Sequence, residues 1–364
     1  MRELVFVVSD LFISQETPER ELPPGVSLPG LQYITRFASR TQVADWRVWL
    51  ARWLARSDEG TESHQNASVG ARKFASIGGP ATVAAAALNS KLIATAGISN
   101  TSTVWIATPV HLITGLTSLH LDRRGILRLS PVEAAALVTD FQRVFHDSGF
   151  VLHALTSGDF LLFGHTPTGV QTLEPARLMG SSVAEAQRAD RAADPTLRRL
   201  GAEIEMWLHD HAINAARQRR GEFPVSGLWF WGGGPMPSGR TTTAGEPPDL
   251  AFGNDACLEG LWALYNGHSL PLPQQLSEVF SYPHARRAVL VIEMSSLLNA
   301  NPTWTFFEAM SHIDRTWLSP AVNALKQGDV NRLVMIANDR ELALHRRDRL
   351  KFWRRVPSGL SGLQ

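Results

Sequence analysis

The sequence predicts an α/β protein built on a largely parallel, helix-covered sheet. Three apolar runs, at 4–8, 287–293 and 332–337, contain β-branched and other apolar residues without alternation, and a fourth lies at 228–231. Runs that are apolar on both faces are typical of strands buried between layers of helices. Each run ends on polar residues or on glycines. In open α/β sheets ligands bind outside the carboxyl ends of the strands, so a site is expected there.

Amphipathic segments fill the intervals between these strands. The segment 41–55 carries apolar residues at helical spacing, and 130–147 begins with a Ser-Pro-Val-Glu capping box. Two further helices are expected at 195–220 and 305–326. The stretches 104–121 and 149–163 have the character of strands in an inserted α+β subdomain.

Composition narrows the class of protein. The 364 residues are 44% hydrophobic and 19% charged, as in a globular protein with a sizeable core. The net charge of +1 makes nucleic acid an unlikely partner. The single cysteine, Cys257, excludes an internal disulfide and is expected to be a small packed residue. The first apolar run is too short for a signal peptide and no stretch is long enough to cross a membrane, so a cytoplasmic protein without membrane association is expected.

The densest group of candidate functional residues begins in the predicted helix at 195–220. There His211 and Asn214 share a stripe next to Arg217, and the chain then enters the strand at 228–231 and three glycines, Gly232–Gly234. Adjacent glycines permit positive φ and expose backbone N–H groups to an anionic ligand. The spacing fits neither a P-loop nor a dinucleotide fingerprint. A tight turn required for packing is the alternative interpretation.

These residues also carry a family resemblance. Leu-His-Asp-His-Ala-Ile-Asn at 208–214, Arg217 and Leu-Trp-Phe-Trp-Gly-Gly-Gly at 228–234 resemble bacterial proteins described as cofactor-independent phosphoglycerate mutase-like. Trp-Ile-Ala-Thr-Pro-Val-His-Leu at 105–112 and Lys-Phe-Trp-Arg-Arg at 351–355 add to the resemblance, which runs from about Asp10 to Arg355. The group is similar to the archaeal type of metal-dependent phosphoglycerate mutase in the alkaline phosphatase superfamily. The resemblance implies an alkaline-phosphatase-like core over 1–100 and 222–364, with an α+β insertion and connecting helices over 101–221.

The resemblance also implies where ligands would bind. Metal ligands of an intact site would be Asp10, Asp339 and His345, holding a divalent ion such as Mn²⁺ or Zn²⁺. Arg340 stands where active enzymes have a histidine after the late aspartate, and no serine or threonine lies in a recognisable nucleophile motif. The predicted ligand-binding residues are His111, His211, Asn214, Arg217, Gly232, Gly233 and Gly234. The alternative interpretation of His111 is a histidine that is hydrogen-bonded inside a sheet and does not contact a ligand.

Three functions remain open on the sequence alone. The leading hypothesis is a divergent mutase-like protein with a degenerate metal site and no cofactor, which binds a small anionic or phosphorylated ligand or a protein partner. The first alternative is an active metal-dependent phosphomutase or phosphatase. The second is an interaction or scaffold protein that uses its eleven tryptophans.

The carboxyl-terminal segment is strongly basic. Six of the residues from 346 to 355 are Lys or Arg, and Phe352 and Trp353 lie among them. The pattern is compatible with binding of an anionic ligand or nucleic acid. The favoured interpretation is a solvated helix whose aromatic side chains dock on the body of the protein.

Overall fold

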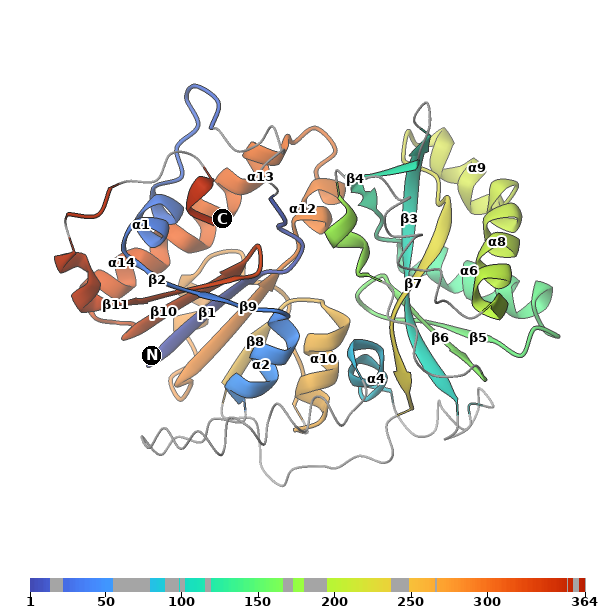
Figure 1. Ribbon diagram of the computed structural model, residues 1–364, viewed down its shortest axis with the longest axis horizontal. Helices are drawn as coiled ribbons and strands as arrows, with labels where there is room; N and C mark the ends of the chain where they lie inside the picture. Colours follow the sequence, from blue (N-terminus) through green and yellow to red (C-terminus); the bar gives the residue numbers. More distant parts are fainter. Residues whose placement is uncertain are drawn as a thin grey trace. The chain divides into compact units, whose positions relative to one another are not determined.

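The computed structural model forms two compact units, which are described separately (Figure 1). Unit 1 comprises 1–50, 246–254 and 268–364, and unit 2 comprises 51–245 and 255–267. The structure describes residues 1–13, 22–54, 79–88, 98, 102–114, 119–165, 173–179, 195–236, 249–265, 267–351, 353–355 and 360–363. The segment 177–193, whose polar, Ala- and Arg-rich sequence predicts an exposed helix or a connector, lies mostly outside these residues. The predicted insertion at 101–221 falls within unit 2, which also contains the strand that follows it.

Unit 1 holds a six-stranded sheet in the order β2-β11-β10-β1-β9-β8. Its four parallel strands are β10 (Arg332–Ala337), β1 (Glu3–Val8), β9 (Arg287–Ile292) and β8 (Asp249–Phe252). The two outer strands, β11 (Arg340–His345) and β2 (Ser39–Gln42), run antiparallel to their neighbours. The apolar runs of β1, β9 and β10 are buried, which confirms a mixed α/β architecture with parallel central strands.

Helices cover one face of this sheet through a single apolar core. They are α1 (Pro29–Phe37), α12 (Met294–Ala300), α13 (Phe306–Ile313) and α14 (Ser319–Gln327), and a π-helical turn, η4 (Asp314–Leu318), joins the last two. Leu4, Phe6 and Met335 alternate along their strands and face the core that contains Leu31 and Met310. The remaining short elements of unit 1 are α11 (Ser277–Phe280), η5 (Arg346–Leu350) and η6 (Ser361–Leu363).

Unit 2 holds an antiparallel sheet centred on β3 (Thr103–Thr114). This strand pairs with β4 (Leu119–Ile126), β6 (Phe160–Gly164) and β7 (Gly227–Pro235), and β5 (Val151–Ala154) continues the sheet beyond β6. The prediction that 228–231 belongs to the parallel sheet is therefore wrong. An apolar run reports that a strand is buried but not which strand it pairs with, and here the partner is the antiparallel β3.

Helices pack on both faces of the second sheet. On one face α6 (Pro131–Val144) and α8 (Pro195–His209) share a core with β3, β5 and β6, and on the other α4 (Pro80–Ala85) and α10 (Ala256–Ala263) pack against β3, β6 and β7. Cys257 is buried in the second of these cores, and its thiol donates to the Pro80 carbonyl over 3.4 Å. The remaining elements are α9 (Ala212–Arg219) and η2 (Pro175–Leu178), while α2 (Trp46–Leu54) crosses the boundary between the units.

Three predicted helices differ from the observed ones. The segment 195–220 is divided into α8 and α9 because His211 caps the amino end of α9, its Nδ1 accepting from the Ile213 amide over 3.2 Å. The segment 305–326 contains the π-helical turn η4, and 41–55 begins as the end of strand β2 before α2 starts at Trp46. The capping box of α6 at Ser130 and Glu133 is present as predicted.

Among the described residues, no helix combines the length and the apolar character needed to span a bilayer.

Candidate functional site

Asp10 follows β1 at the carboxyl edge of the unit 1 sheet, as the sequence predicts, but its carboxylate caps a helix. Oδ1 accepts from the Met294 amide over 2.6 Å and Oδ2 from the Ser295 amide over 2.7 Å, at the first two residues of α12. Burial, and then the charge of Glu293, raise the pKa of Asp10 against the effect of these hydrogen bonds. Both carboxylate oxygens are thus engaged with backbone amides that lack an intrahelical partner.

Asp339 lies at the same edge of the sheet, in the two-residue turn between β10 and β11. Asn338 and Asp339 both have positive φ, 51° and 56°, which the short polar side chains of Asn and Asp tolerate best among non-glycine residues. The Asn338 carboxamide fixes this turn, since its oxygen accepts from the Ile13 amide over 3.0 Å and its nitrogen donates to the Leu363 carbonyl over 2.9 Å.

His345 stands at the opposite edge of the sheet. Strand β11 runs from Arg340, which pairs with Ala337 at the carboxyl end of β10, to His345, which pairs with Arg332 at its amino end. The length of β11 therefore separates His345 from Asp339. Among the residues that the structure describes, no group of three or more His, Cys, Asp or Glu side chains has an arrangement that could hold a metal ion. The described residues do not fit the dinuclear centre that the resemblance implies.

A small hollow opens at this edge between the ends of β1 and β10. Its volume is about 10 Å³, and the apolar part of its wall includes Val7 and Ile336. The polar part includes Asn338, Asp339 and Trp46. The Trp46 side chain is only 6% exposed, and its indole Nε1 has no acceptor among the described residues. A buried N–H donor without an acceptor costs free energy, so a hydrogen-bond acceptor that reached the Trp46 indole would be stabilised.

Three arginines crowd the neighbouring β2–β11 edge. Burial lowers the pKa of Arg40, and the charges of Arg354 and Arg340 lower it further. Arg340 directly follows Asp339, the charged residue that lines the hollow.

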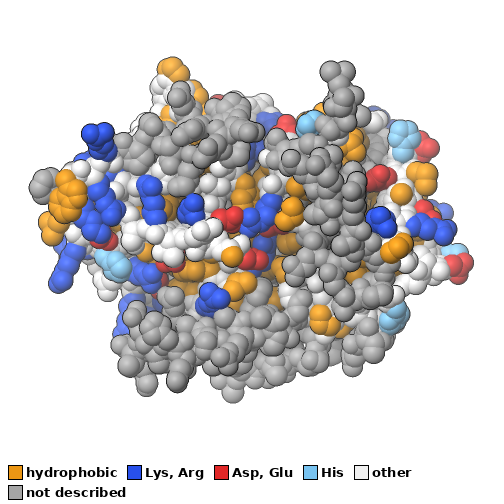
Figure 2. Space-filling model, viewed as in Figure 1, with side chains coloured by type: hydrophobic (Ala, Val, Ile, Leu, Met, Phe, Trp, Pro, Cys, Tyr) orange, Lys and Arg blue, Asp and Glu red, His pale blue; other side chains and the backbone are white. Residues whose placement is uncertain are grey.

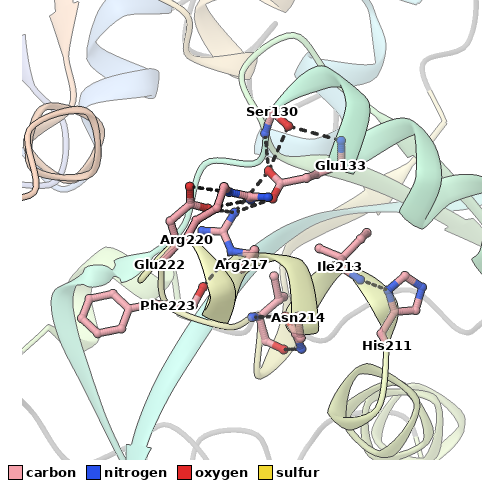
Figure 3. Close-up of polar contacts among 10 residues, drawn as sticks. Ser130, Glu133, His211, Ile213, Asn214, Arg217, Arg220, Glu222 and Phe223 are labelled. Carbon is pink, nitrogen blue, oxygen red and sulfur yellow. Dashed lines mark hydrogen bonds and ion pairs between the residues drawn. The ribbon is translucent and has the colours of Figure 1, made fainter.

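The predicted ligand residues at the start of α9 and within it lie in unit 2, where their side chains bind groups of neighbouring segments (Figure 3). Asn214 is buried, and its side-chain nitrogen donates to the carbonyls of Leu208 and Val225 over 2.7 and 2.9 Å. Its side-chain oxygen accepts from the Val225 amide over 2.7 Å. One side chain thereby joins the end of α8, the start of α9 and the segment that leads into β7.

Arg217 is buried in the same network. Its Nε donates to the Phe223 carbonyl over 2.7 Å, and its Nη1 lies 3.2 Å from each carboxylate oxygen of Glu133. Arg220 also donates to Glu133, and it pairs with Glu222. Figure 3 shows these charges facing one another between α6 and α9. The positive charge of Arg217 is therefore already compensated within the protein.

The two predicted histidines have intramolecular partners as well. His111 Nδ1 lies 2.9 Å from the Pro224 carbonyl, and the ring stacks on Phe223 with 4.8 Å between ring centroids. His211 is buried, with Nε2 3.2 Å from a carboxylate oxygen of Asp140 and its ring against Trp207. Both histidines are thus engaged by neighbouring residues of unit 2.

The three glycines lie within a strand, and the prediction of a glycine loop is wrong. Gly232, Gly233 and Gly234 belong to β7, and the register of its pairing with β3 shifts between Val104 and Ile106. Gly232 has φ +65°, and a Cβ at Gly233 would lie 2.4 Å from the Trp105 indole nitrogen. Glycine is therefore required by the irregular pairing and by close packing against an indole ring.

The network around Glu133 predicts an acid-sensitive unit 2. Burial is the largest single influence on Glu133 and by itself raises its pKa. Hydrogen bonds from Ser130 and Arg220 and the charge of Arg217 together outweigh burial, so the pKa lies below its ordinary value of 4.5. Because the folded state binds this proton less readily than the unfolded state, the stabilisation is present above that value and is lost as the pH falls below it. We expect Glu133→Gln to destabilise the protein by about 2 kcal/mol at neutral pH.

The measurement is urea denaturation of both proteins over a falling pH series. The gap between wild type and Glu133→Gln should narrow as Glu133 of the wild type becomes protonated. Glu203→Gln is the matched control, because Glu203 forms an exposed pair with Arg199 on α8. A gap that stays constant with pH would mean that the ionised carboxylate is not what stabilises the network.

Sequence reasoning missed two residues that matter here. Glu133 was identified only as half of a capping box, because its arginine partner lies 84 residues further along the chain. Trp46 was assigned to an apolar helix face, and nothing in the sequence indicates that its N–H lacks an acceptor. Its position at the start of α2, shortly after β2, is the only signal that the sequence offers.

Comparison with solved structures yields several similar chains, including the two that follow. No protein family model matches the chain, and no curated protein matches it. The PH0037 protein from Pyrococcus horikoshii is 10% identical, with a TM-score of 0.43 over 93% of this chain and 82% of its own. A cofactor-independent phosphoglycerate mutase from Thermoplasma acidophilum DSM 1728 is 13% identical, with a TM-score of 0.38 over 94% and 89% of the two chains.

Proposed function

We propose that the protein is a metal-independent binding protein for a small anionic ligand, which it holds at the carboxyl edge of the unit 1 sheet. The observation that carries the proposal is the buried Trp46 indole, an N–H donor without an acceptor in the wall of a hollow at the ends of β1 and β10. The carboxyl edge is where open α/β sheets bind ligands. A hollow of about 10 Å³ has room for a single water-sized group, so the ligand would insert one oxygen.

The charges around the hollow support an anion that also carries a hydroxyl group. Arg340 and its neighbours make the β2–β11 edge positive, and Asp339 in the wall would accept a hydrogen bond from a hydroxyl. Phosphoglycerate has both groups, and the resemblance of the sequence to mutase-like proteins makes it the first compound to test. The engagement of both Asp10 oxygens supports binding without metal-dependent phosphoryl transfer.

The test is isothermal titration calorimetry with 3-phosphoglycerate and with inorganic phosphate, in the presence of EDTA. Loss of one hydrogen bond to an anion corresponds to about a tenfold change in affinity, so Trp46→Phe should weaken binding by about that factor. Trp49→Phe is the matched control on the same helix, since the Trp49 indole donates to Glu341 over 2.9 Å and should not contribute to ligand binding.

Two kinds of result would contradict the proposal. One is equal affinity for wild type and Trp46→Phe, or no binding of either compound. The other is hydrolysis of a phosphate ester that requires added Mn²⁺ together with stoichiometric bound metal, which would instead support the active phosphatase.

A further inference from the structure

The segment after β11 presents an unusual concentration of positive charge on unit 1. Four arginines of this segment are exposed: Arg346, Arg347, Arg349 and Arg355. The one acidic residue among them, Asp348, has other partners. Its carboxylate lies 2.6 Å from Lys351 Nζ and accepts from the His345 amide over 2.7 Å. Among the described residues, no ion pair involves the four exposed arginines.

Two large apolar side chains lie among these arginines. Leu350 is 64% exposed and Trp353 is 70% exposed. The expectation of a solvated helix with docked aromatics is therefore wrong for Trp353, because the helical part is a single 3₁₀ turn, η5, and the chain leaves it before Trp353. Phe352 lies outside the described residues. Single exposed apolar residues are common, but two of them three positions apart put apolar and positively charged side chains into one short exposed segment.

This segment is attached firmly to the body of unit 1. The Arg354 guanidinium donates to the carbonyls of Phe37 and Ala38 over 3.1 and 2.7 Å, at the carboxyl end of α1, and Arg36 donates to the Arg354 carbonyl over 2.8 Å. Cations are favoured at this end of a helix. Arg346, Arg347, Arg349, Leu350, Trp353 and Arg355 thus belong to a segment that is anchored on unit 1 at Arg354, and we call their exposed side chains the basic face.

The positive charge extends beyond the segment itself. Burial lowers the pKa of Arg40, and Arg354 and Arg340 lie close enough to lower it further. Lys326, at the end of α14, lies over the Tyr33 ring at 4.2 Å. Figure 2 shows Lys and Arg side chains, with hydrophobic ones among them, at the end of unit 1 where Figure 1 places α14 and β11.

We propose that the basic face docks on the surface of an anionic phospholipid bilayer. Each Lys or Arg near an anionic lipid surface strengthens binding about fivefold, and the four exposed arginines supply the electrostatic part. Tryptophan is the residue that favours the boundary between headgroups and acyl chains, and Leu350 beside it adds apolar area to be buried. The proposal concerns a peripheral contact and is independent of the ligand proposed at the carboxyl edge.

The apolar pair favours a bilayer over a nucleic acid. A single strand of nucleic acid would use Trp353 for stacking and the arginines for phosphate contacts, but an aliphatic side chain has no partner in that mode of binding. A bilayer surface accommodates the aromatic ring, the leucine and the guanidinium groups together.

The test uses the full chain in sedimentation with phosphatidylcholine vesicles, with and without phosphatidylserine. We expect binding only to the phosphatidylserine vesicles, and release at high salt because the attraction is screened. Arg347→Gln and Arg349→Gln should each weaken binding about fivefold. Leu350→Ala with Trp353→Ala should weaken it further without changing the salt dependence. These side chains are exposed, so the variants should fold normally.

Matched control variants come from exposed positions in unit 2. Arg143 on α6 has a side chain that is 73% exposed, and Met206 on α8 is 68% exposed. Arg143→Gln and Met206→Ala should bind vesicles as the wild type does. Three results would overturn the proposal: equal binding to both kinds of vesicle, unchanged binding of the basic-face variants, or tight binding of a single-stranded oligonucleotide by a protein that ignores vesicles. A basic-face variant that no longer binds vesicles should still bind 3-phosphoglycerate with the affinity of the wild type. Failure of one proposal can therefore be distinguished from failure of the other.

Discussion

Asn214→Ala is expected to lower the free energy of unfolding by about 4 kcal/mol. The side chain makes three hydrogen bonds, of 2.7 to 2.9 Å, to the backbone of Leu208 and Val225. Alanine would leave the amide and the carbonyl of Val225 inside the protein without these partners, whereas the Leu208 carbonyl would keep its bond from the His211 amide. Each unsatisfied buried group costs about 1–3 kcal/mol. The measurement is urea denaturation followed by circular dichroism.

The matched control is Gln218→Ala, on the same helix but exposed. This variant should unfold at the urea concentration of the wild type. The experiment separates the two interpretations of this motif. If Asn214 were a ligand contact, Asn214→Ala would reduce ligand affinity and leave the unfolding midpoint in place, and that outcome would contradict the structural role assigned here.

The parallel part of the fold could be predicted from the sequence because its signals are local. The apolar runs of β1, β9 and β10 and the capping box at Ser130 each depend on residues that are adjacent in the chain. The membership of β7 in the antiparallel sheet could not be predicted, since its pairing partner β3 lies more than a hundred residues away. The glycines of β7 depend on that same pairing, because Trp105 is what leaves no room for a side chain at Gly233.

The sequence predicts Asp10 and Asp339 at the carboxyl ends of strands, but it predicts neither the partners of Asp10 nor the part that Trp46 plays in the candidate site. The carboxyl edge of the unit 1 sheet follows from strand order, and Asp10 and Asp339 lie there. Spacing cannot show that the partners of Asp10 are amides 284 and 285 residues further on, or that β11 carries His345 to the other edge. Likewise His211, Asn214 and Arg217 are all buried, but their partners come from distant segments and from the helix ends.

Asp10→Ala is expected to destabilise the protein by about 3 kcal/mol, whether or not metal is present. The substitution removes two charge-assisted hydrogen bonds to the Met294 and Ser295 amides, and hydrogen bonds to charged groups contribute about 1.5–3 kcal/mol each. Residual hydration of the freed amides offsets part of this loss. Urea denaturation in EDTA and in Mn²⁺ should give the same difference between variant and wild type.

Asp339→Asn provides the control that distinguishes a helix cap from a metal ligand. Asparagine tolerates the φ of 56° at this position, so the turn is kept while the negative charge is removed. A metal centre that used both aspartates would lose its ion in either variant, and the stability difference would appear only with Mn²⁺ present. A helix cap predicts instead that Asp10→Ala is destabilised in EDTA and that Asp339→Asn is not. The two carboxylates share an edge of the sheet, and this pair of variants separates what they do there.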